Sequence, residues 1–152
     1  MILGVIPARL NSTRFPNKVI FSLNGKTIVE HVYNKAIQSS LIDKLVVAVD
    51  SEKTEKLINC SNIMMTSDKH ESGTDRVAEV ANNYDCDIVV NIQGDEPGID
   101  PKLIDQLISL FNDPDVKMAS VASTDLDKND LKLGKVLRRP IEGLVDYHLK
   151  NI

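Results

Sequence analysis

The sequence predicts an α/β fold in which helices cover both faces of a mostly parallel sheet. Short apolar runs alternate with segments whose apolar residues recur at helical spacing, and this alternation is typical of parallel sheets. The run within residues 44–50 is continuously apolar, as expected for a strand that is buried on both faces. No linker-like stretch divides the chain, so residues 1–152 are predicted to form a single domain.

Five strands are predicted, each as an apolar run of strand length that ends in a polar turn. They lie at residues 1–6, 44–50, 63–65, 87–93 and 117–122. Residues 136–137 are a candidate for a sixth, smaller strand. The order of these runs along the chain, with a helical segment between most of them, is what favours parallel over antiparallel pairing.

The first helix is predicted from a capping box, in which Thr27 precedes Glu30 by three residues. The apolar spacing continues to about Ser39, and residues 23–26 before it form a turn. The buried stripe of this helix is predicted to be Ile28, Val32, Ala36 and Ile37.

Four more helices are predicted from caps and periodicity. A short one covers 51–59, one covers 75–83 behind a cap at 72–75, and one begins at Asp100 and Pro101 and runs to about Asn112. Its inward side is predicted to be Leu103, Leu107 and Leu110. The last, at 141–152, has an amphipathic pattern that predicts packing on the sheet or on a partner subunit.

Composition excludes several classes of function. The net charge of −4 argues against general nucleic-acid binding, which needs a basic face. No apolar run is long enough to cross a membrane, and Met1 leads straight into the first strand without a signal-peptide pattern. Cys60 and Cys86 lack metal-type spacing. Reduced thiols and a cytoplasmic location are therefore expected.

A basic loop follows the first strand. It carries Arg9, Arg14 and Lys18, and no Asp or Glu occurs anywhere between Met1 and Val29. The carboxyl end of a strand is where open α/β sheets hold ligands, and guanidinium and ammonium groups suit phosphate or carboxylate oxygens. The loop is therefore predicted to bind an anion, and the alternative is an ordinary solvated basic loop.

A second polar run, Gln93-Gly94-Asp95-Glu96-Pro97, follows the fourth strand. The end of this strand places Asp95 at the same edge of the sheet as the basic loop, and the glycine lets backbone approach a ligand closely. A carboxylate beside bound phosphates suits Mg²⁺, which takes oxygen ligands. The alternative interpretation is a polar turn between a strand and a helix.

The run at 70–79, His-Glu-Ser-Gly-Thr-Asp-Arg-Val-Ala-Glu, is the third candidate. Its Ser72 can cap the following helix, whose start supplies free backbone N–H groups and the positive end of the helix dipole. Ordinary helix capping is the alternative, and the two are compatible. His70 is interpreted as a turn residue, because no Ser-His-Asp or metal arrangement surrounds it in the sequence.

These three runs carry a family resemblance. Pro7-Ala8-Arg9, Ser12-Thr13-Arg14 and Pro16-Asn17-Lys18 resemble the opening motif of the sugar nucleotidyltransferases, most closely the 3-deoxy-manno-octulosonate cytidylyltransferases. That family has glycine where this chain has Asn17, and asparagine tolerates the left-handed backbone that the turn needs. The runs at 93–97 and 70–79 also match the family in order and spacing, so the resemblance extends to about Ala122.

The resemblance implies a Rossmann-like nucleotide-diphospho-sugar transferase fold and a reaction that couples CTP to 3-deoxy-manno-octulosonate, releasing pyrophosphate, in surface-sugar (lipopolysaccharide) biosynthesis. It implies that the chain binds CTP and an acidic sugar and that Asp95 holds Mg²⁺. The implied catalytic residues are Arg9, Lys18 and Asp95. The implied nucleotide-binding residues are Pro7, Ala8, Arg9, Ser12, Arg14, Lys18, Ser72, Gly73, Thr74, Arg76 and Gln93.

The resemblance fades after Ala122, and residues 125–152 form a divergent tail in which only 134–137 suggest a remnant of the family. The family's chain is longer, and its distal part supplies a second metal-binding Asp, sugar contacts and most of the dimer surface. A shortened fold is therefore expected, with a homodimer left open. Two alternatives remain: an acylneuraminate-type or other sugar nucleotidyltransferase, and a truncated, non-catalytic nucleotide-binding module.

Overall fold

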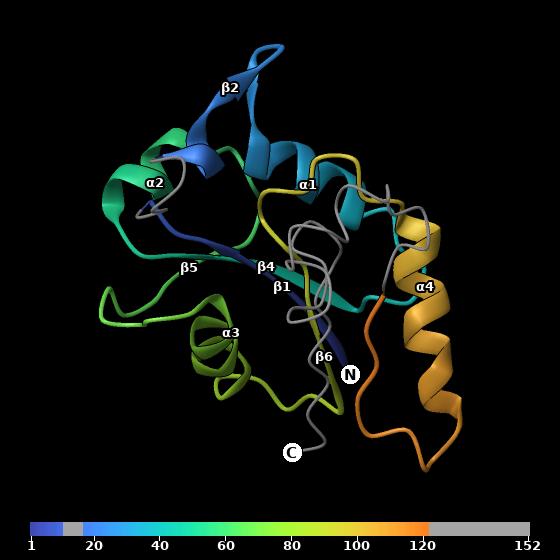
Figure 1. Ribbon diagram of the computed structural model, residues 1–152. Helices are drawn as coiled ribbons and strands as arrows, with labels where there is room; N and C mark the ends of the chain where they lie inside the picture. The colour runs from blue at the N-terminus through green and yellow to red at the C-terminus, as the bar shows by residue number, and fades with distance from the viewer. Residues whose placement is uncertain (11–16, 122–152) are drawn as a thin grey trace, which may run out of the picture.

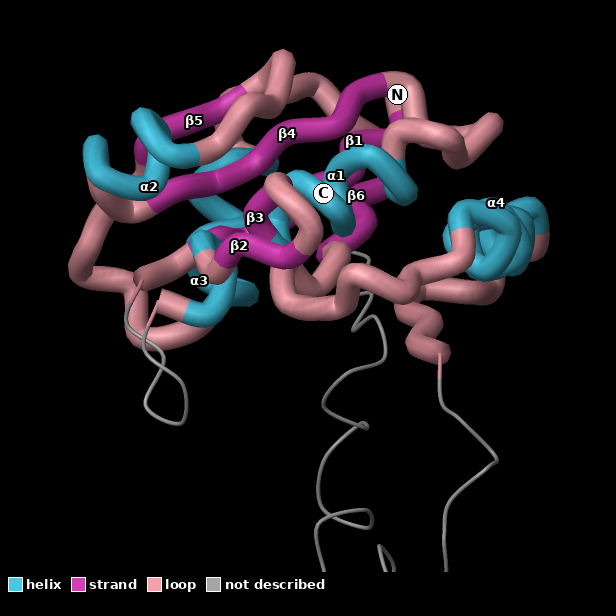
Figure 2. Tube along the Cα trace, turned by 90° about the horizontal axis from the view of Figure 1, so that it is seen from above, coloured by secondary structure: helices cyan, strands magenta, loops and turns pink. Residues whose placement is uncertain are grey.

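The computed structural model describes residues 1–10 and 17–121. Its centre is a parallel sheet of four strands in the order β5-β4-β1-β6 (Figure 1), and the view from above shows β5, β4 and β1 side by side (Figure 2). The strands are β1 (Ile2–Ala8), β4 (Lys44–Val49), β5 (Ile63–Met65) and β6 (Ile88–Asn91). The predicted parallel α/β sheet is therefore confirmed.

Helices cover both faces of this sheet. They are α1 (Ile28–Ala36), α2 (Glu52–Leu57), α3 (Gly73–Ala81) and α4 (Pro101–Ser109), with short 3₁₀ turns η1 (Lys18–Ile20) and η2 (Leu110–Asn112). On one face, α1 and α4 pack on β-strand residues such as Ile6 and Val47. On the other, α3 packs on residues such as Val5 and Val46. In the part of the chain that the structure describes, no helix is long and apolar enough to span a membrane.

Local sequence signals explain where the elements begin. The predicted capping box of Thr27 and Glu30 opens α1, and Asp100 followed by proline opens α4. A small hairpin, β2 (Ser22–Leu23) and β3 (Lys26–Thr27), turns at Asn24 and Gly25, whose φ angles are 51° and 80°. The hairpin leads directly into α1, and the chain rejoins the sheet at β4.

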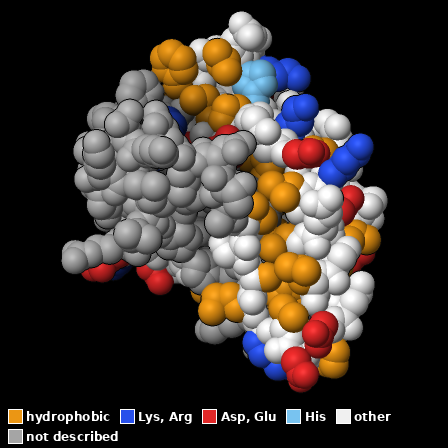
Figure 3. Space-filling model, turned by 45° about the vertical axis from the view of Figure 1, so that its right-hand side comes forward, with side chains coloured by type: hydrophobic (Ala, Val, Ile, Leu, Met, Phe, Trp, Pro, Cys, Tyr) orange, Lys and Arg blue, Asp and Glu red, His pale blue; other side chains and the backbone are white. Residues whose placement is uncertain are grey.

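Two helical stripes differ from the prediction. In α1 the buried residues are Val29, Val32, Tyr33 and Ala36, and Ile37 is exposed. In α4 they are Ile104, Leu107 and Ile108, whereas Leu110 is exposed. Val32, Ala36 and Leu107 are buried as predicted, whereas Ile37 and Leu110 each lie just past the last residue of their helix. Figure 3 turns the α4 side of the molecule forward and shows hydrophobic side chains along that face.

The predicted strand at 117–122 is wrong for the residues that the structure describes, 117–121, which are irregular. Ala119 and Val121 still pack on the core beside α1 and α4. An apolar pattern reports burial of side chains, whereas a strand also needs a backbone ladder with a neighbouring strand. The predictions for Ala122, for 136–137 and for the helix at 141–152 lie outside the described residues.

Candidate functional site

The basic loop after β1 and the acidic turn after β6 meet at the carboxyl end of the sheet. Lys18 Nζ lies 2.7 Å from Asp95 Oδ2, and each side chain is 39% exposed. An exposed ion pair of this kind contributes only about 0–1 kcal/mol to stability. The ion pair is therefore easily exchanged, and both side chains are accessible to a ligand. The predicted shared rim of Lys18 and Asp95 is confirmed.

Backbone contacts hold this rim in place. A Cβ added at Gly94 would lie 2.6 Å from the Pro7 carbonyl oxygen, so the turn after β6 presses directly on the end of β1. Asn17 adopts the left-handed conformation, with φ 62°, and its N–H donates to the Leu10 carbonyl at 3.1 Å. The asparagine thus serves in the turn where the resembled family has glycine, as expected.

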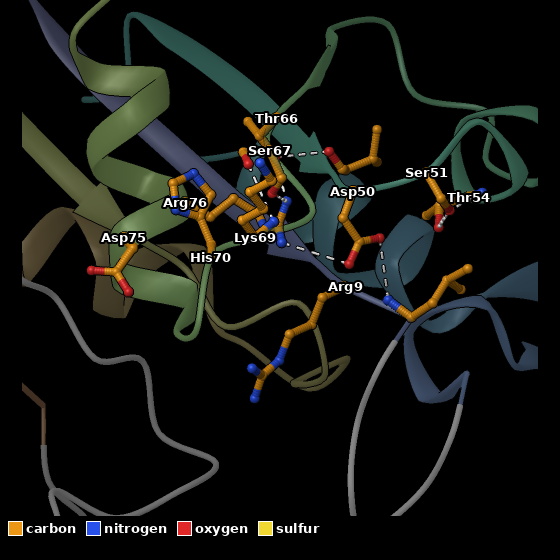
Figure 4. Close-up of polar contacts among 12 residues, drawn as sticks. Arg9, Asp50, Ser51, Thr54, Thr66, Ser67, Lys69, His70, Asp75 and Arg76 are labelled. Atoms are coloured by element: carbon orange, nitrogen blue, oxygen red, sulfur yellow. Dashed lines mark hydrogen bonds and ion pairs between the residues drawn. The ribbon is translucent and has the colours of Figure 1, made fainter.

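Arg9 extends the rim toward α3. It is exposed, and its Nη1 donates to the Glu71 carbonyl at 3.1 Å, so the guanidinium lies against the loop that precedes α3. In Figure 4 it lies beneath Asp50 and Arg76. This arrangement joins the basic loop to the third sequence run, as the topology of a parallel sheet predicts.

The start of α3 is a full capping box. Ser72 Oγ accepts from the N–H of Asp75 at 3.1 Å and donates to the Asp75 carboxylate at 2.7 Å, and this hydrogen bond lowers the pKa of Asp75. A Cβ on Gly73 would meet the Pro7 ring at 3.4 Å, so the helix begins directly against the end of β1. Thr74, in the first turn, is exposed. Ordinary capping is therefore present. The close packing of Gly73 on Pro7 places the N-terminus of the helix at the rim.

Arg76, a predicted nucleotide-binding residue, is buried in α3. Its residue is 1% exposed, and the guanidinium is used inside the protein (Figure 4). Nη1 donates to Thr66 Oγ1 and to the Ser67 carbonyl at 3.2 Å, and Nη2 lies 3.6 Å from Asp50 Oδ2. Burial lowers its pKa, and Asp50 opposes that shift. Arg76 thus supports the loop before α3, and its role in binding the nucleotide stays a prediction.

The other residues singled out from the sequence differ in where they lie. Pro7 and Ala8 are buried at the end of β1, where they pair with Ala48 and Val49 of β4. Gln93 is half-buried at the exit of β6. Ser12 and Arg14 lie outside the described residues. His70 pairs with Glu79 and is a turn residue, as interpreted.

Asp50, at the end of β4, is the site residue that the sequence did not reveal. Its Oδ1 accepts from the N–H of Leu10 at 3.4 Å, and its Oδ2 faces Arg76. The available signal was its place: an acid directly after a buried strand, at the same edge as the basic loop. It lies beyond the three sequence runs, so nothing in them pointed to it.

The acidic turn at 93–97 offers carboxylate oxygens, which are the donors that a magnesium ion prefers. Asp95 and its neighbour Glu96 present carboxylate oxygens, and burial, followed by the charge of Asp95, raises the pKa of Glu96. Mg²⁺ commonly takes one or two carboxylates and completes its shell with water and phosphate oxygens. Residues 1–10 and 17–121 contain no cluster of three or more metal-type side chains, so the protein donors in this part are few.

Comparison with known proteins decides the family. The model of the family described as "Cytidylyltransferase" matches residues 3–134. The chain belongs to the cytidylyltransferase family. Among curated relatives, it is 46% identical to a 3-deoxy-manno-octulosonate cytidylyltransferase of Trichlorobacter lovleyi over 125 residues, which cover 80% of this chain and 50% of the relative. The enzyme of the same description from Leptospira interrogans is 46% identical over 130 residues, which cover 83% and 53%.

Solved cytidylyltransferase structures share the fold. A CMP:2-keto-3-deoxy-manno-octonic acid synthetase complexed with CTP superposes with a TM-score of 0.74 at 28% identity, covering 99% of this chain and 71% of that one. A cytidylyltransferase from Leptospira borgpetersenii gives 0.67 at 23% identity, covering 91% and 66%. The chain spans about half the length of the curated relatives it matches.

Proposed function

We propose that this chain forms the nucleotide-binding part of a 3-deoxy-manno-octulosonate cytidylyltransferase, which couples CTP to that sugar acid and releases pyrophosphate. The observation that carries the proposal is the pair of Lys18 and Asp95, 2.7 Å apart at the carboxyl end of the sheet. A cation and a carboxylate at one exposed rim are what a metal-bound triphosphate requires. The curated relatives with this chemistry in their description support the choice of nucleotide and sugar.

In the proposed reaction, a hydroxyl oxygen of the sugar acid bonds to the α-phosphorus of CTP. The bond between the α-phosphorus and the bridging oxygen to the β-phosphate breaks, pyrophosphate leaves, and the hydroxyl proton passes to solvent. Such transfers gain mostly from positioning and from neutralising charge. We assign Lys18 and Arg9 to the triphosphate oxygens, since both side chains are accessible at the rim.

We assign Asp95 as the residue that holds Mg²⁺. When bound, the ion supplies charge neutralisation to the phosphates and lowers the pKa of a coordinated hydroxyl. The half-exposed carboxylate and its weak ion pair support this, because Lys18 is free to exchange Asp95 for a phosphate oxygen. Ser72, Gly73 and Thr74 are proposed to face the nucleoside, since α3 begins against the end of β1.

The setting of the reaction is proposed from the same chemistry. Cys60 and Cys86 are free thiols, and burial raises the pKa of Cys60 to about 12, which keeps it protonated and unreactive. Free thiols and a CTP substrate suit a cytoplasmic step of surface-sugar synthesis. A homodimer stays a prediction.

Two measurements on the purified chain test the proposal. Calorimetry with CTP and Mg²⁺ measures binding, and a pyrophosphate assay with CTP and 3-deoxy-manno-octulosonate measures turnover. Binding together with turnover supports the full proposal. Turnover only with another acidic sugar, such as an acylneuraminate, identifies a different transferase. Binding without turnover supports a nucleotide-binding module. A folded chain that binds no CTP would refute the site.

A further inference from the structure

A network of polar contacts lies beneath the rim and joins four segments that are distant in the sequence. Asp50 is at its centre, with its side chain 11% exposed at the end of β4. One carboxylate oxygen accepts from the backbone N–H of Leu10, directly after Arg9, at 3.4 Å. The other lies 3.6 Å from the guanidinium of Arg76 in α3 (Figure 4).

Arg76 carries the connection onward to the loop before α3. Its side chain, 2% exposed, donates to the Thr66 hydroxyl and to the Ser67 carbonyl. Thr66 is fixed in turn, because its hydroxyl donates to the Val49 carbonyl at 2.8 Å. A buried guanidinium without a counter-charge would be costly, so Asp50 and Arg76 depend on each other.

The network also accounts for the placement of Arg9. Arg9 donates to Glu71 in the loop that Arg76 supports, while the next residue along the chain is held by Asp50. The Arg9 side chain is thus bound to the loop before α3, and the backbone that follows it is bound to Asp50. The charge of Arg9 also acts on Arg76, and Asp50 is the acid that faces Arg76 most directly.

We propose that Asp50 is a positioning residue that ties the backbone of the anion-binding loop to the buried Arg76 guanidinium, so that the loop after β1 and the start of α3 keep a fixed separation. The expected effect on CTP binding rests on the proposed function, whereas the tether itself rests on the structure alone. Asp50 acts through Leu10 and Arg76, and it makes no contact with the ligand itself in this scheme. Pre-organised loops bind more tightly because less ordering is left to occur on binding.

Asp50→Ala tests this, with Asp43→Ala as the matched control. Asp43 also accepts a β1 backbone N–H, from Ile2 at 2.6 Å, but at the opposite end of the sheet. Amide hydrogen exchange measures the protection of the Leu10 N–H, calorimetry measures the Kd for CTP with Mg²⁺, and urea unfolding verifies that each variant is folded. We expect Asp50→Ala to lose the Leu10 protection and to bind CTP roughly tenfold more weakly, as expected for loss of a hydrogen bond to a charged group.

Asp43→Ala is expected to leave both values unchanged. If Asp50→Ala fails to fold, Asp50→Asn, which keeps one acceptor oxygen, replaces it and is expected to show a smaller loss of both. Unchanged Leu10 protection and unchanged Kd in a folded Asp50 variant would overturn the proposal, as would an equal loss of affinity in Asp43→Ala. If the unmodified chain binds no CTP, the proposed function fails, and the Leu10 exchange still decides whether the tether exists.

Discussion

Gly94 sets how closely the acidic turn approaches the end of β1. The position of a Cβ there, 2.6 Å from the Pro7 carbonyl oxygen and 3.3 Å from Ile6 Cγ2, leaves no room for a side chain unless backbone moves. We expect Gly94→Ala to lower the free energy of unfolding by about 1–3 kcal/mol, as overpacking does. Urea denaturation measures this.

Gly98→Ala is the control for that substitution, because its nearest neighbour would be the flexible Glu96 carboxylate at 3.6 Å. It lies four residues further along the same turn and should change stability by less than about 0.5 kcal/mol. Equal effects of the two alanines would show that the close approach at Gly94 is unimportant.

Glu79 supports the loop before α3 by accepting the N–H of Ser67 at 3.0 Å and by pairing with His70. The Ser67 hydrogen bond, and after it that of His70, lowers the pKa of Glu79 below its ordinary value of 4.5. Stability from a lowered acid pKa is present above the ordinary value and is lost as the pH falls through the lowered one. The Glu79 side chain is 35% exposed, and solvent screening keeps the contribution below about 1 kcal/mol.

We therefore expect Glu79→Gln to lower the unfolding free energy at pH 7 by less than about 1 kcal/mol, and the difference to vanish once the pH has fallen through the lowered pKa of Glu79. The unfolding free energies of the variant and the unmodified chain, measured across pH 2–7, test this difference. Glu55→Gln, on the exposed face of α2, is the control. A difference that persists at low pH would mean that ionisation of Glu79 is not its source.

Single residues were predictable from sequence where one local rule governs them. The left-handed turn at Asn17 and the cap at Ser72 follow from backbone preferences, and both are present. The roles of Arg76 and Asp50 were not predictable, because burial of a guanidinium depends on which strand end faces which helix. A motif position does not tell whether its side chain points to a ligand or into the protein.

At the scale of elements, α3 is capped by Ser72, which is also proposed to contact the nucleotide. Ser72→Ala should cost about 1 kcal/mol of stability, because the N-cap acceptor is lost. Ser72→Asn keeps a capping side chain and should restore most of that stability. Denaturation of both variants, together with CTP calorimetry, separates the two roles.

If the Ser72 hydroxyl also contacts the nucleotide, as proposed, Ser72→Asn should bind CTP more weakly despite its restored stability. Equal CTP affinity of Ser72→Asn and the unmodified chain would limit Ser72 to capping. Thr27→Ala, which removes the cap of α1 on the other face of the sheet, serves as the control and should cost similar stability without affecting CTP.

The elements themselves were largely predictable, and their buried faces less so. Strands β1, β4, β5 and β6 and the starts of α1 and α4 lie where apolar runs and caps placed them. Ile37 and Leu110 were assigned inward from apolar spacing, but α1 ends at Ala36 and α4 at Ser109, so both residues lie at the helix ends and are exposed. The irregular course of 117–121 shows the same limit for a strand, whose ladder needs a partner.

At the scale of the whole molecule, parallel topology gathers the site. Strands β1, β4 and β6 all end at one edge, and that edge collects Arg9 and Lys18 after β1, Asp50 after β4 and Asp95 after β6. This arrangement was predictable for the basic loop and Asp95, since parallel strands align their carboxyl ends. Because the chain spans about half the length of the relatives it matches, the predicted site covers only the nucleotide side of the reaction.

The most direct test of the shared rim is a calorimetric titration of CTP into the chain with Mg²⁺, comparing the unmodified protein with Lys18→Ala. We expect saturable one-to-one binding that requires Mg²⁺ and weakens by at least roughly tenfold when the Lys18 charge is removed, as for other charge-assisted phosphate contacts. Binding of equal strength in folded Lys18→Ala, or no binding to the folded unmodified chain, would contradict the site.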